Sequence, residues 1–213
     1  MKIGIIGTGN MGRTLGVQWA RAGHEVLFGA RDRAVAERAA AQVGAQAGSL
    51  DEAAGFGDVV LYTLRGVAPS AVLRSSLDGK VVIDCNNTDF DPTSATGFAP
   101  PPVPSYTEQI ARDAPGARVV QAFTTTPHVV LELAKDQLEP HRISVFLCGD
   151  DERAKHLVAQ LVADLGLVAI DSGTLADAAL VYGVADFIRF HILKRDRGPY
   201  LTISLAPIAG GPQ

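Results

Sequence analysis

The segment GTGNMG at residues 7–12 constrains the fold of this chain more than any other stretch. It directly follows the short apolar run KIGII at residues 2–6, and residues 13–22 then carry apolar side chains at helical spacing. A lone GxGxxG pattern is weak, because glycine is common in turns. Between a strand and a helix, however, the three glycines permit a tight turn, close approach of a pyrophosphate, and close helix–strand packing. The context therefore predicts a dinucleotide-binding turn rather than a structural loop.

Strands and helices alternate along the chain beyond this turn. Helical patterns such as residues 33–43, which end at Gly44, lie between most of the apolar runs. This alternation predicts an α/β fold with a Rossmann-like, doubly wound and mainly parallel sheet that is covered on both faces. The further predicted strands lie at residues 25–28, 58–63, 80–84, 117–121, 143–148 and 167–170.

The pattern changes near residue 173. Residues 174–195 read as one long helix, followed by a short apolar tail at residues 200–208. We therefore expect a nucleotide-binding domain over residues 1–172 and a small C-terminal helical unit over residues 173–213, and apolar residues on this helix and tail favour a homodimer. The expected apolar face consists of Leu175, Ala179, Tyr182, Ala185, Ile188 and Ile192.

Composition and charge exclude several classes of function. The 213 residues are 47% hydrophobic and 20% charged, which is enough apolar material for one core with a small appendage. The net charge of −4 and the lack of a dense Lys/Arg run argue against nucleic-acid and membrane surfaces, and no apolar stretch approaches the roughly 20 residues that span a bilayer. Cys85 and Cys148 match no zinc-binding spacing, so we expect reduced, buried thiols, no metal and a cytoplasmic protein.

The end of the second predicted strand distinguishes NAD from NADP. An NAD site usually has an acid there that binds the ribose 2′-hydroxyl. This chain reads FGARDR at residues 28–33, so Arg31 can pair with a 2′-phosphate and lie over the adenine, with Arg33 as a second contact. The stretch favours NADP and leaves Asp32 as an alternative acceptor for the ribose hydroxyl.

Polar residues follow the third, fourth and fifth long strands. Because ligands bind at the carboxyl ends of strands in open parallel sheets, these residues are candidates to line a cleft for a second reactant. Turn and capping chemistry is the alternative, since Thr126-Pro127 is a good helix start and Asn pairs are routine in turns. The loop at residues 86–104, with five prolines, is typical of a functional flap or a mobile segment. The candidates are Arg65, Asn86, Asn87, Thr124, Thr125, Thr126 and His128.

Taken together, the motifs resemble those of a known family. After GTGNMG the chain contains HEVLFGARD, VVQAFTTTP, CGDDERAK and GLVAIDSGTLADAALVY, in this order. They are similar to motifs of the NADP-dependent oxidoreductases of the deazaflavin coenzyme F420, a group that also includes the cytosolic domain of membrane ferric reductases. The resemblance covers nearly the whole chain. It implies hydride transfer between NADPH and a second planar redox partner, F420 or a flavin-like molecule, in a cleft between the nucleotide domain and the C-terminal unit.

The resemblance also implies a set of cofactor-binding residues. The glycine turn would hold the pyrophosphate and the nicotinamide ribose, the residues after the second strand would frame the 2′-phosphate, and the end of the third strand would pass along the cofactor. The expected set is Gly7, Thr8, Gly9, Asn10, Met11, Gly12, Ala30, Arg31, Arg33, Thr63 and Leu64.

The chain departs from the family pattern in three places. Ala30 replaces a serine that would donate to the phosphate, which predicts a weaker preference for NADP. Thr124 stands where the deazaflavin enzyme has a histidine near its second cofactor, and the proline-rich flap at residues 99–104 has no counterpart. These departures leave the acceptor open between a deazaflavin, a flavin and a small organic molecule.

The last helix is polar on one side, which predicts either a solvated face or an electropositive lip for an acidic acceptor. The residues concerned are Asp186, Arg189, His191, Lys194, Arg195 and Arg197.

Two classes of function remain open from the sequence. One is an NADPH-dependent oxidoreductase, and the other is an NADP(H)-binding redox-sensing module without turnover. Hydride transfer needs proximity and orientation more than an acid–base pair, so the lack of an obvious catalytic dyad does not oppose an enzyme, and no catalytic residue is assigned. An enzyme should leave open space above Gly9 and Thr124, whereas a sensor should close this space with side chains.

Overall fold

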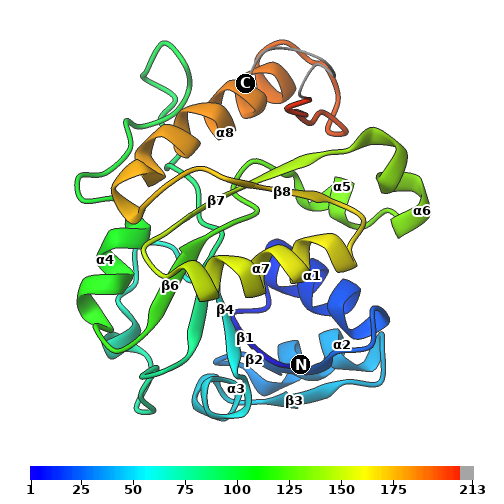
Figure 1. Cartoon of the computed structure of the whole chain (residues 1–213), viewed down its shortest axis with the longest axis vertical. Helices are drawn as coiled ribbons and strands as arrows, with labels where there is room; N and C mark the ends of the chain where they lie inside the picture. Colours follow the sequence, from blue (N-terminus) through cyan, green and yellow to red (C-terminus); the bar gives the residue numbers. More distant parts are fainter. Residues whose placement is uncertain (207–213) are drawn as a thin grey trace.

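The computed structural model describes residues 1–206, which form one eight-stranded sheet flanked by helices (Figure 1). The strand order is β3-β2-β1-β4-β5-β6-β7-β8, and every neighbouring pair is parallel except β6 and β7. The order reverses between β1 and β4, which confirms a doubly wound, mainly parallel sheet with a switch point at β1. The strands are β1 (Lys2–Ile6), β2 (Glu25–Gly29), β3 (Gln46–Gly48), β4 (Val59–Tyr62), β5 (Val81–Asp84), β6 (Arg118–Gln121), β7 (Ser144–Gly149) and β8 (Val168–Asp171).

Helices cover both faces of the sheet (Figure 1). One face packs against α1 (Asn10–Arg21), α2 (Arg33–Ala41) and α7 (Glu152–Asp164). The other face packs against α3 (Leu50–Phe56), α4 (Tyr106–Asp113) and α8 (Ala178–Leu193). The remaining elements are the short helices α5 (His128–Leu131) and α6 (Lys135–Leu138) and single 3₁₀ turns at Pro69–Ala71, Glu139–His141 and Leu175–Asp177.

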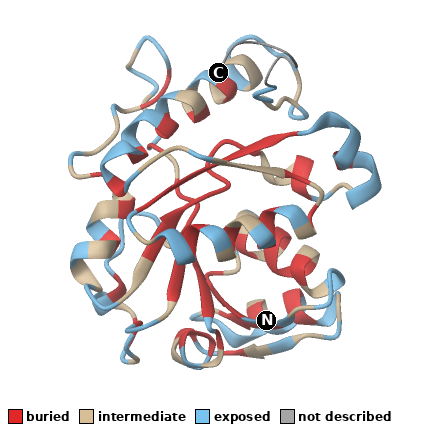
Figure 2. Ribbon diagram, viewed as in Figure 1, coloured by how far each residue is buried: buried red, intermediate tan, exposed pale blue. Residues whose placement is uncertain are grey.

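The core has two sides because alternate strand residues point to opposite faces. In β1, Ile3 and Ile5 pack with the α1 side, whereas Ile6 packs with the α3 side. All three are fully buried, and each such side chain contributes about 1.5–3 kcal/mol to the free energy of unfolding. Figure 2 shows the inner strands as the buried centre of the molecule, whereas β3 and β8 at the two ends of the sheet are more exposed.

Trp19 links α1 to two other parts of the core. Its Nε1 donates to the carbonyl oxygen of Leu161 in α7 at 3.2 Å, which satisfies the one polar atom of a fully buried indole. Its ring meets Phe123 edge to face, with 5.7 Å between centroids. The helix that follows the glycine turn is therefore fixed both to α7 and to the end of β6.

The structure contains two elements that hydrophobic periodicity does not predict. β3 is the three-residue segment QAG, which lacks the β-branched and aromatic residues typical of strands. α3 begins after Ser49, which forms a capping box with Glu52. The spacing of this serine and glutamate is the sequence signal that predicts the start of α3.

The C-terminal helix begins later than the sequence predicts. The 3₁₀ turn Leu175–Asp177 precedes α8, which shifts its buried face so that Ala179 is exposed and Ala178 is buried. Val181 of α8 packs on Phe146 of β7. The division into two units at residues 172 and 173 stays a prediction, and its last part, residues 207–213, lies outside the described residues together with the end of the expected tail.

Candidate functional site

The glycine turn joins β1 to α1 at the switch point of the sheet. Gly7 has φ +98, a conformation that favours glycine, and its N–H donates to the carbonyl oxygen of Gly29 at 3.0 Å. A Cβ at Gly12 would lie 1.9 Å from the Gly7 carbonyl oxygen, so the close packing of helix on turn requires glycine there. Both residues serve the shape of the backbone.

Gly9 has a different role in the same turn. It is the N-cap of α1, where no side chain caps the helix, and a Cβ built on it would have no atom within 4 Å. The first N–H groups of α1 therefore face open space, with the positive end of the helix dipole behind them. This arrangement, which includes Thr8, Asn10 and Met11, fits a bound pyrophosphate. We call Gly7–Gly12 the phosphate cradle.

Two residues at the end of β4 border the cradle. The Thr63 hydroxyl oxygen lies 3.0 Å from the Ile6 carbonyl oxygen and 3.1 Å from that of Gly7, so its proton is shared with the backbone of the turn. The Leu64 side chain lies 3.0 Å from the position that a Cβ of Gly7 would take. Thr63 thus holds the backbone of the cradle through its hydroxyl, whereas Leu64 forms part of the wall of the cradle.

The turn after β2 places one free cation near the cradle. Arg31 is exposed and forms no ion pair within residues 1–206, and Ala30 beside it is half-buried. The Asp32 carboxylate caps α2 by accepting from the Ala34 N–H at 3.0 Å, and Arg33 pairs with Glu37 at 3.0 Å. Asp32 is therefore already used by the helix, which leaves Arg31 as the main candidate for a 2′-phosphate.

The structure brings the predicted residues after β5 and β6 together. The Asn87 side-chain amide donates to the Thr124 carbonyl oxygen at 3.1 Å, although 37 residues separate them. The hydroxyls of Thr124, Thr125 and Thr126 are buried and have no hydrogen-bond partner among the described residues. Phe123 before them has φ +62, an uncommon conformation for a bulky residue. The neighbouring His128 begins α5 and is half-buried.

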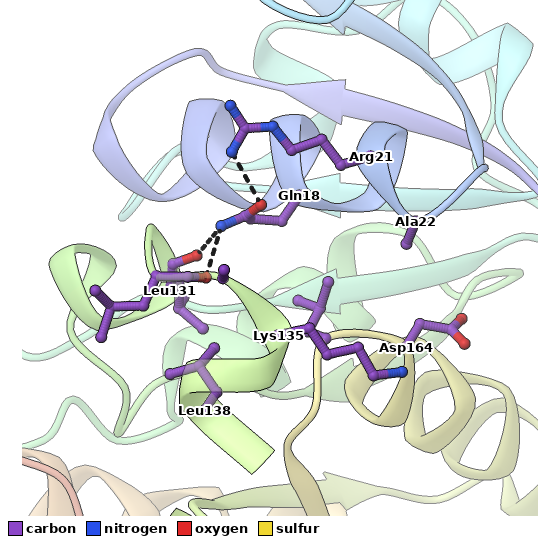
Figure 3. Close-up of a pocket in the computed structure, with 10 residues that line it drawn as sticks. Gln18, Arg21, Ala22, Leu131, Lys135, Leu138 and Asp164 are labelled. Carbon is purple, nitrogen blue, oxygen red and sulfur yellow. Dashed lines mark hydrogen bonds between the residues drawn. The ribbon is translucent and has the colours of Figure 1, made fainter. Parts of the chain in front are cut away.

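The segment after His128 is fixed from behind by α1. The Gln18 side-chain amide donates to the carbonyl oxygens of Leu131 and Leu133 at 2.6 and 3.1 Å (Figure 3). A largely apolar cavity of about 280 Å³ lies between this segment, α1 and α7. It is lined by none of the predicted cofactor or acceptor residues.

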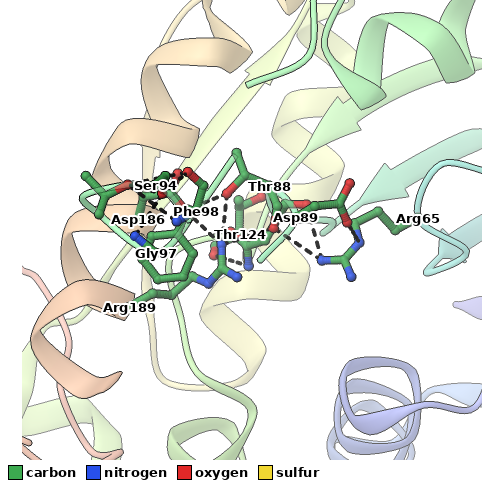
Figure 4. Close-up of polar contacts among 11 residues, drawn as sticks. Arg65, Thr88, Asp89, Ser94, Gly97, Phe98, Thr124, Asp186 and Arg189 are labelled. Atoms are coloured by element: carbon green, nitrogen blue, oxygen red, sulfur yellow. Dashed lines mark hydrogen bonds and ion pairs between the residues drawn. The ribbon is translucent and has the colours of Figure 1, made fainter. Parts of the chain in front are cut away.

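A second polar cluster joins the long loop to α8 (Figure 4). The Thr88 hydroxyl donates to the Asp186 carboxylate at 2.6 Å, and Arg189 Nη1 donates to the same carboxylate at 2.7 Å and to the Thr88 carbonyl oxygen at 3.1 Å. The Arg189 guanidinium also lies 4.1 Å above the Phe98 ring centroid. We call Thr88, Phe98, Asp186 and Arg189 the Thr88 junction.

The Thr88 junction takes two residues out of the polar side of the last helix, for which a solvated face and an electropositive lip were the two predictions. Asp186 and Arg189 face the loop and each other, whereas Lys194, Arg195 and Arg197 stay exposed. His191 is half-buried, with its ring 4.7 Å from that of Phe187. On the polar side of α8, the middle of the helix thus contacts the loop, whereas the residues at its C-terminal end face solvent.

Arg65 fixes the loop from its opposite side. Its Nε lies 3.1 Å from the Asp89 carboxylate, which also accepts from the Tyr106 hydroxyl at 2.6 Å. Its guanidinium points along the loop backbone in Figure 4, with Nη1 3.3 Å from the Thr88 carbonyl oxygen. Arg65, which was predicted to line the cleft for the second reactant, is therefore already bound to the loop.

Asp84 is a functional candidate that the sequence analysis missed. It ends β5, is fully buried, and accepts from the Asn86 backbone N–H at 3.0 Å, the Asn86 side-chain amide at 2.5 Å and the Thr107 hydroxyl at 2.7 Å. Burial raises the pKa of this carboxyl, and the three hydrogen bonds oppose that effect. The only signal in the sequence is an acid at the end of the apolar run VVID.

The described residues give no sign of a reactive thiol, a metal site or a membrane-spanning helix. Cys85 and Cys148 are free and buried, and burial raises the pKa of both thiols, to about 12 for Cys148. Within residues 1–206 no three His, Cys, Asp or Glu side chains are grouped to hold a metal ion. No helix in this range has both the length and the apolar character needed to cross a membrane.

The sheet with its switch point and the uncapped helix at Gly9 define a dinucleotide-binding α/β protein. The family model of the coenzyme F420-dependent NADP oxidoreductases matches residues 2–88. The chain is 31% identical to the F420-dependent NADP reductase of Methanothermobacter thermautotrophicus, over 97% of this chain and 96% of that protein. The chain belongs to the family of F420-dependent NADP oxidoreductases.

Two further proteins are similar to the chain. A solved structure of a candidate F420-dependent NADP reductase from Arthrobacter sp. FB24 superposes with a TM-score of 0.81 at 25% identity, over 97% of this chain and 100% of that one. The rat metalloreductase STEAP3 is 28% identical over 86% of this chain. This chain spans only 36% of the metalloreductase.

Proposed function

We propose that the protein transfers a hydride between NADPH and a second planar redox acceptor, either coenzyme F420 or a flavin-like molecule. The observation that carries the proposal is the open space beside Gly9 at the uncapped start of α1. The full-length relative from Methanothermobacter is a reductase that uses F420 and NADP by name, which favours turnover over sensing. When bound, NADPH supplies the hydride.

The residues of the chain would bind and orient the cofactor. The N–H groups at the start of α1 bind the pyrophosphate, and Arg31 binds the 2′-phosphate, while Leu64 forms part of the wall along the dinucleotide. Thr63 and Gly12 act through the shape of the turn. The proposed cofactor-binding residues remain Gly7, Thr8, Gly9, Asn10, Met11, Gly12, Ala30, Arg31, Arg33, Thr63 and Leu64.

The acceptor would lie at the carboxyl ends of β5 and β6. The unpartnered hydroxyls of Thr124 and Thr126 and the free Asn87 side-chain oxygen offer polar contacts there. Asn86 and His128 complete the candidate set on the same edge. Holding two planar rings in contact is the main requirement for hydride transfer, so these residues would orient the acceptor without moving a proton.

We also propose that the protein is a cytoplasmic homodimer whose partner surface is the outer face of α8. Leu180 and Phe187 on this helix are 72% and 61% exposed, and an apolar hollow of about 390 Å³ lies beside Phe187 and Ile203. Exposed apolar patches of this kind often mark protein contacts. Sedimentation equilibrium should give twice the chain mass, and Phe187→Glu should shift the species toward the monomer.

An oxidation assay with several acceptors tests the proposed reaction. NADPH oxidation is followed in parallel with a deazaflavin, riboflavin, FMN and ferric chelates. Activity with the deazaflavin alone would support transfer to F420. Activity only with the others would show that this chain, which has Thr124 in place of the family's histidine, uses a different acceptor. NADPH binding without oxidation by any of them would favour the redox-sensing alternative.

A further inference from the structure

Asp84 joins the two ends of the long loop. Its Oδ1 accepts from Asn86 at the start of the loop, and its Oδ2 accepts from Thr107 in α4, just after the loop ends. Asp84 itself is 0% exposed, so these hydrogen bonds are shielded from water. One side chain thus determines how the chain leaves β5 and how it returns to α4.

The same contacts fix the orientation of the Asn86 side chain. Oδ1 of Asp84 already accepts from the Asn86 backbone N–H, so the Asn86 group that faces it at 2.5 Å must be the NH₂. A reversed amide would place two acceptor oxygens against each other. Oδ2 accepts one hydrogen bond and Oδ1 accepts two, so a proton on this carboxyl would fit best on Oδ2. The Thr107 hydroxyl would then turn and accept from it, and the contacts of Oδ1 with Asn86 would stay the same. The Asn86 side-chain oxygen is therefore always the end turned away from Asp84.

Asn86 lines a cavity beside the cradle. The cavity has a volume of about 120 Å³, and its other walls include Leu64 from the end of β4 and Tyr106 from α4. Leu64 also borders Gly7, so one side chain separates the phosphate cradle from this cavity. The hydroxyl of Tyr106 is engaged with Asp89, and the Gln109 side-chain amide donates to the Pro104 carbonyl oxygen. The side-chain oxygens of Asn86 and Gln109 are therefore acceptors at this small cavity, and that of Asn86 is the one whose orientation a buried carboxylate fixes.

We propose that Asp84 is a positioning residue that directs the Asn86 side-chain oxygen toward a planar amide of the bound redox pair. Its N–H donor would come either from the nicotinamide carboxamide or from the pyrimidine ring of a flavin-like acceptor. The inference rests on the proposed function, because it assigns a binding role within the same site. It adds a preference for ligands that present an N–H at this point.

Five variants separate positioning from a purely structural role: three single variants at Asp84 and Asn86, the double variant that combines Asp84→Ala with Asn86→Ala, and one control. Asp84→Ala removes the acceptor that orients Asn86, whereas Asp84→Asn keeps an oxygen for Asn86 and offers an NH₂ to Thr107. Asn86→Ala removes the contact directly and keeps the test open if Asp84→Ala does not fold. Asp51→Ala is the matched control, since Asp51 likewise joins separate parts of the chain by accepting hydrogen bonds, from the backbone N–H groups of Arg74 and Ser75, but lies outside the site.

The measurements are the NADPH dissociation constant by fluorescence titration, the acceptor KM, and the melting temperature. Asp84→Ala and Asn86→Ala should each weaken one of the two ligands about five- to tenfold, the loss expected for one hydrogen bond. Asp84→Asn should stay within about twofold of the parent, and the double alanine variant should bind no worse than Asn86→Ala alone. A change in NADPH affinity identifies the carboxamide, and a change in acceptor KM alone identifies the acceptor ring.

Unchanged constants for both ligands in Asn86→Ala would overturn the inference, as would additive losses in the double variant. It is likewise overturned if Asp84→Asn loses as much affinity as Asp84→Ala, or if Asp51→Ala loses ligand affinity to the same degree. Failure of the proposed function looks different, because the parent protein itself would then neither bind NADPH nor oxidise it.

Discussion

The phosphate cradle and the Thr88 junction lie at the same edge of the sheet, but backbone atoms form the cradle and side chains form the junction. The cradle spans six consecutive residues, and its internal contacts are made by backbone atoms and by the absence of side chains. The Thr88 junction joins side chains that are about 100 residues apart in sequence. One added methyl group can close a site formed by the backbone or distort its shape. A side chain of the junction can be replaced without moving the strands. The cofactor half of the reaction is thus more tightly constrained than the acceptor half.

The largest effect is expected from Gly12→Ala, which tests the backbone character of the cradle. The new methyl group would meet the Gly7 carbonyl oxygen at 1.9 Å, so the turn or the helix must move. The free energy of unfolding should fall by about 3 kcal/mol, and NADPH binding should be lost. Urea unfolding and a fluorescence titration measure the two effects. Parent-like behaviour in both would show that the turn is not rigid.

Gly9→Ala is the matched variant two positions away from the helix–turn contact. Its φ of −68 suits alanine and the methyl group meets no protein atom, so the stability should change by less than about 0.5 kcal/mol. The methyl group fills the space proposed for the pyrophosphate, so NADPH affinity should fall at least about tenfold, or about 1.4 kcal/mol. Full affinity in this variant would place the phosphates elsewhere.

Arg31 tests whether the cradle is tuned to NADP. The parent should bind NADPH at least about tenfold more tightly than NADH, an advantage of roughly 1.4 kcal/mol, and Arg31→Ala should bring the ratio close to one. Arg38→Ala is the control, because Arg38 is an exposed arginine of α2 outside the proposed cofactor-binding set. Equal affinities of the parent in the titration would contradict the prediction.

Arg189→Ala should affect the acceptor half alone. It removes a donor to both the Thr88 carbonyl oxygen and the Asp186 carboxylate, leaves the direct Thr88–Asp186 hydrogen bond in place, and should lower the free energy of unfolding by about 1 kcal/mol. The acceptor KM should rise severalfold while the NADPH dissociation constant stays constant. Arg195→Ala, which removes an exposed arginine of the same chain segment, should change neither constant. Equal weakening of both ligands by Arg189→Ala would show that the two halves are not independent.

The smallest effect is expected from the pH dependence of Asp84, which lies between the two halves. Burial raises its pKa, so the unfolded chain releases this proton at a lower pH than the folded chain does. The contribution of Asp84 to stability should therefore decrease as the pH rises above the ordinary carboxyl pKa. Asp84→Asn removes this dependence, and its stability relative to the parent should be higher at pH 7 than at pH 4. Urea unfolding at both values checks the sign, and a difference that does not change with pH would contradict it.

Local patterns in the sequence predicted the local fold of the cofactor half well, whereas its binding residues stay a prediction. KIGII, GTGNMG and the helix after them form one continuous unit whose roles follow from backbone geometry, and FGARDR lies at the end of the adjacent strand β2. The alternation of strands and helices predicted the sheet for the same reason. Periodicity did not predict β3 and α3, since QAG carries no strand signal and the start of α3 is indicated by its capping box rather than by an apolar stripe.

The acceptor half was predicted as a set of residues but not as an arrangement. Asn87 and Thr124 were expected at the same edge, and the structure joins them. Thr88 gave no sequence signal, and Asp84 gave only that of an acid at the end of the apolar run VVID. The roles of both depend on partners in α8 and α4 that only the folded chain brings near. Both residues matter because they are buried with their hydrogen bonds, and the burial of a polar residue cannot be predicted from its neighbours in sequence.

Trp19 gives the molecule a built-in optical reporter. It is the only tryptophan of the chain, it lies on the helix that begins at the phosphate cradle, and its ring meets Phe123 directly before Thr124. Reduced nicotinamide absorbs where indole emits, so energy transfer should quench this emission when NADPH arrives. A wavelength shift of the same emission would instead report a rearrangement of the turn at Phe123. One unlabelled chromophore can thus time the loading of the two halves separately.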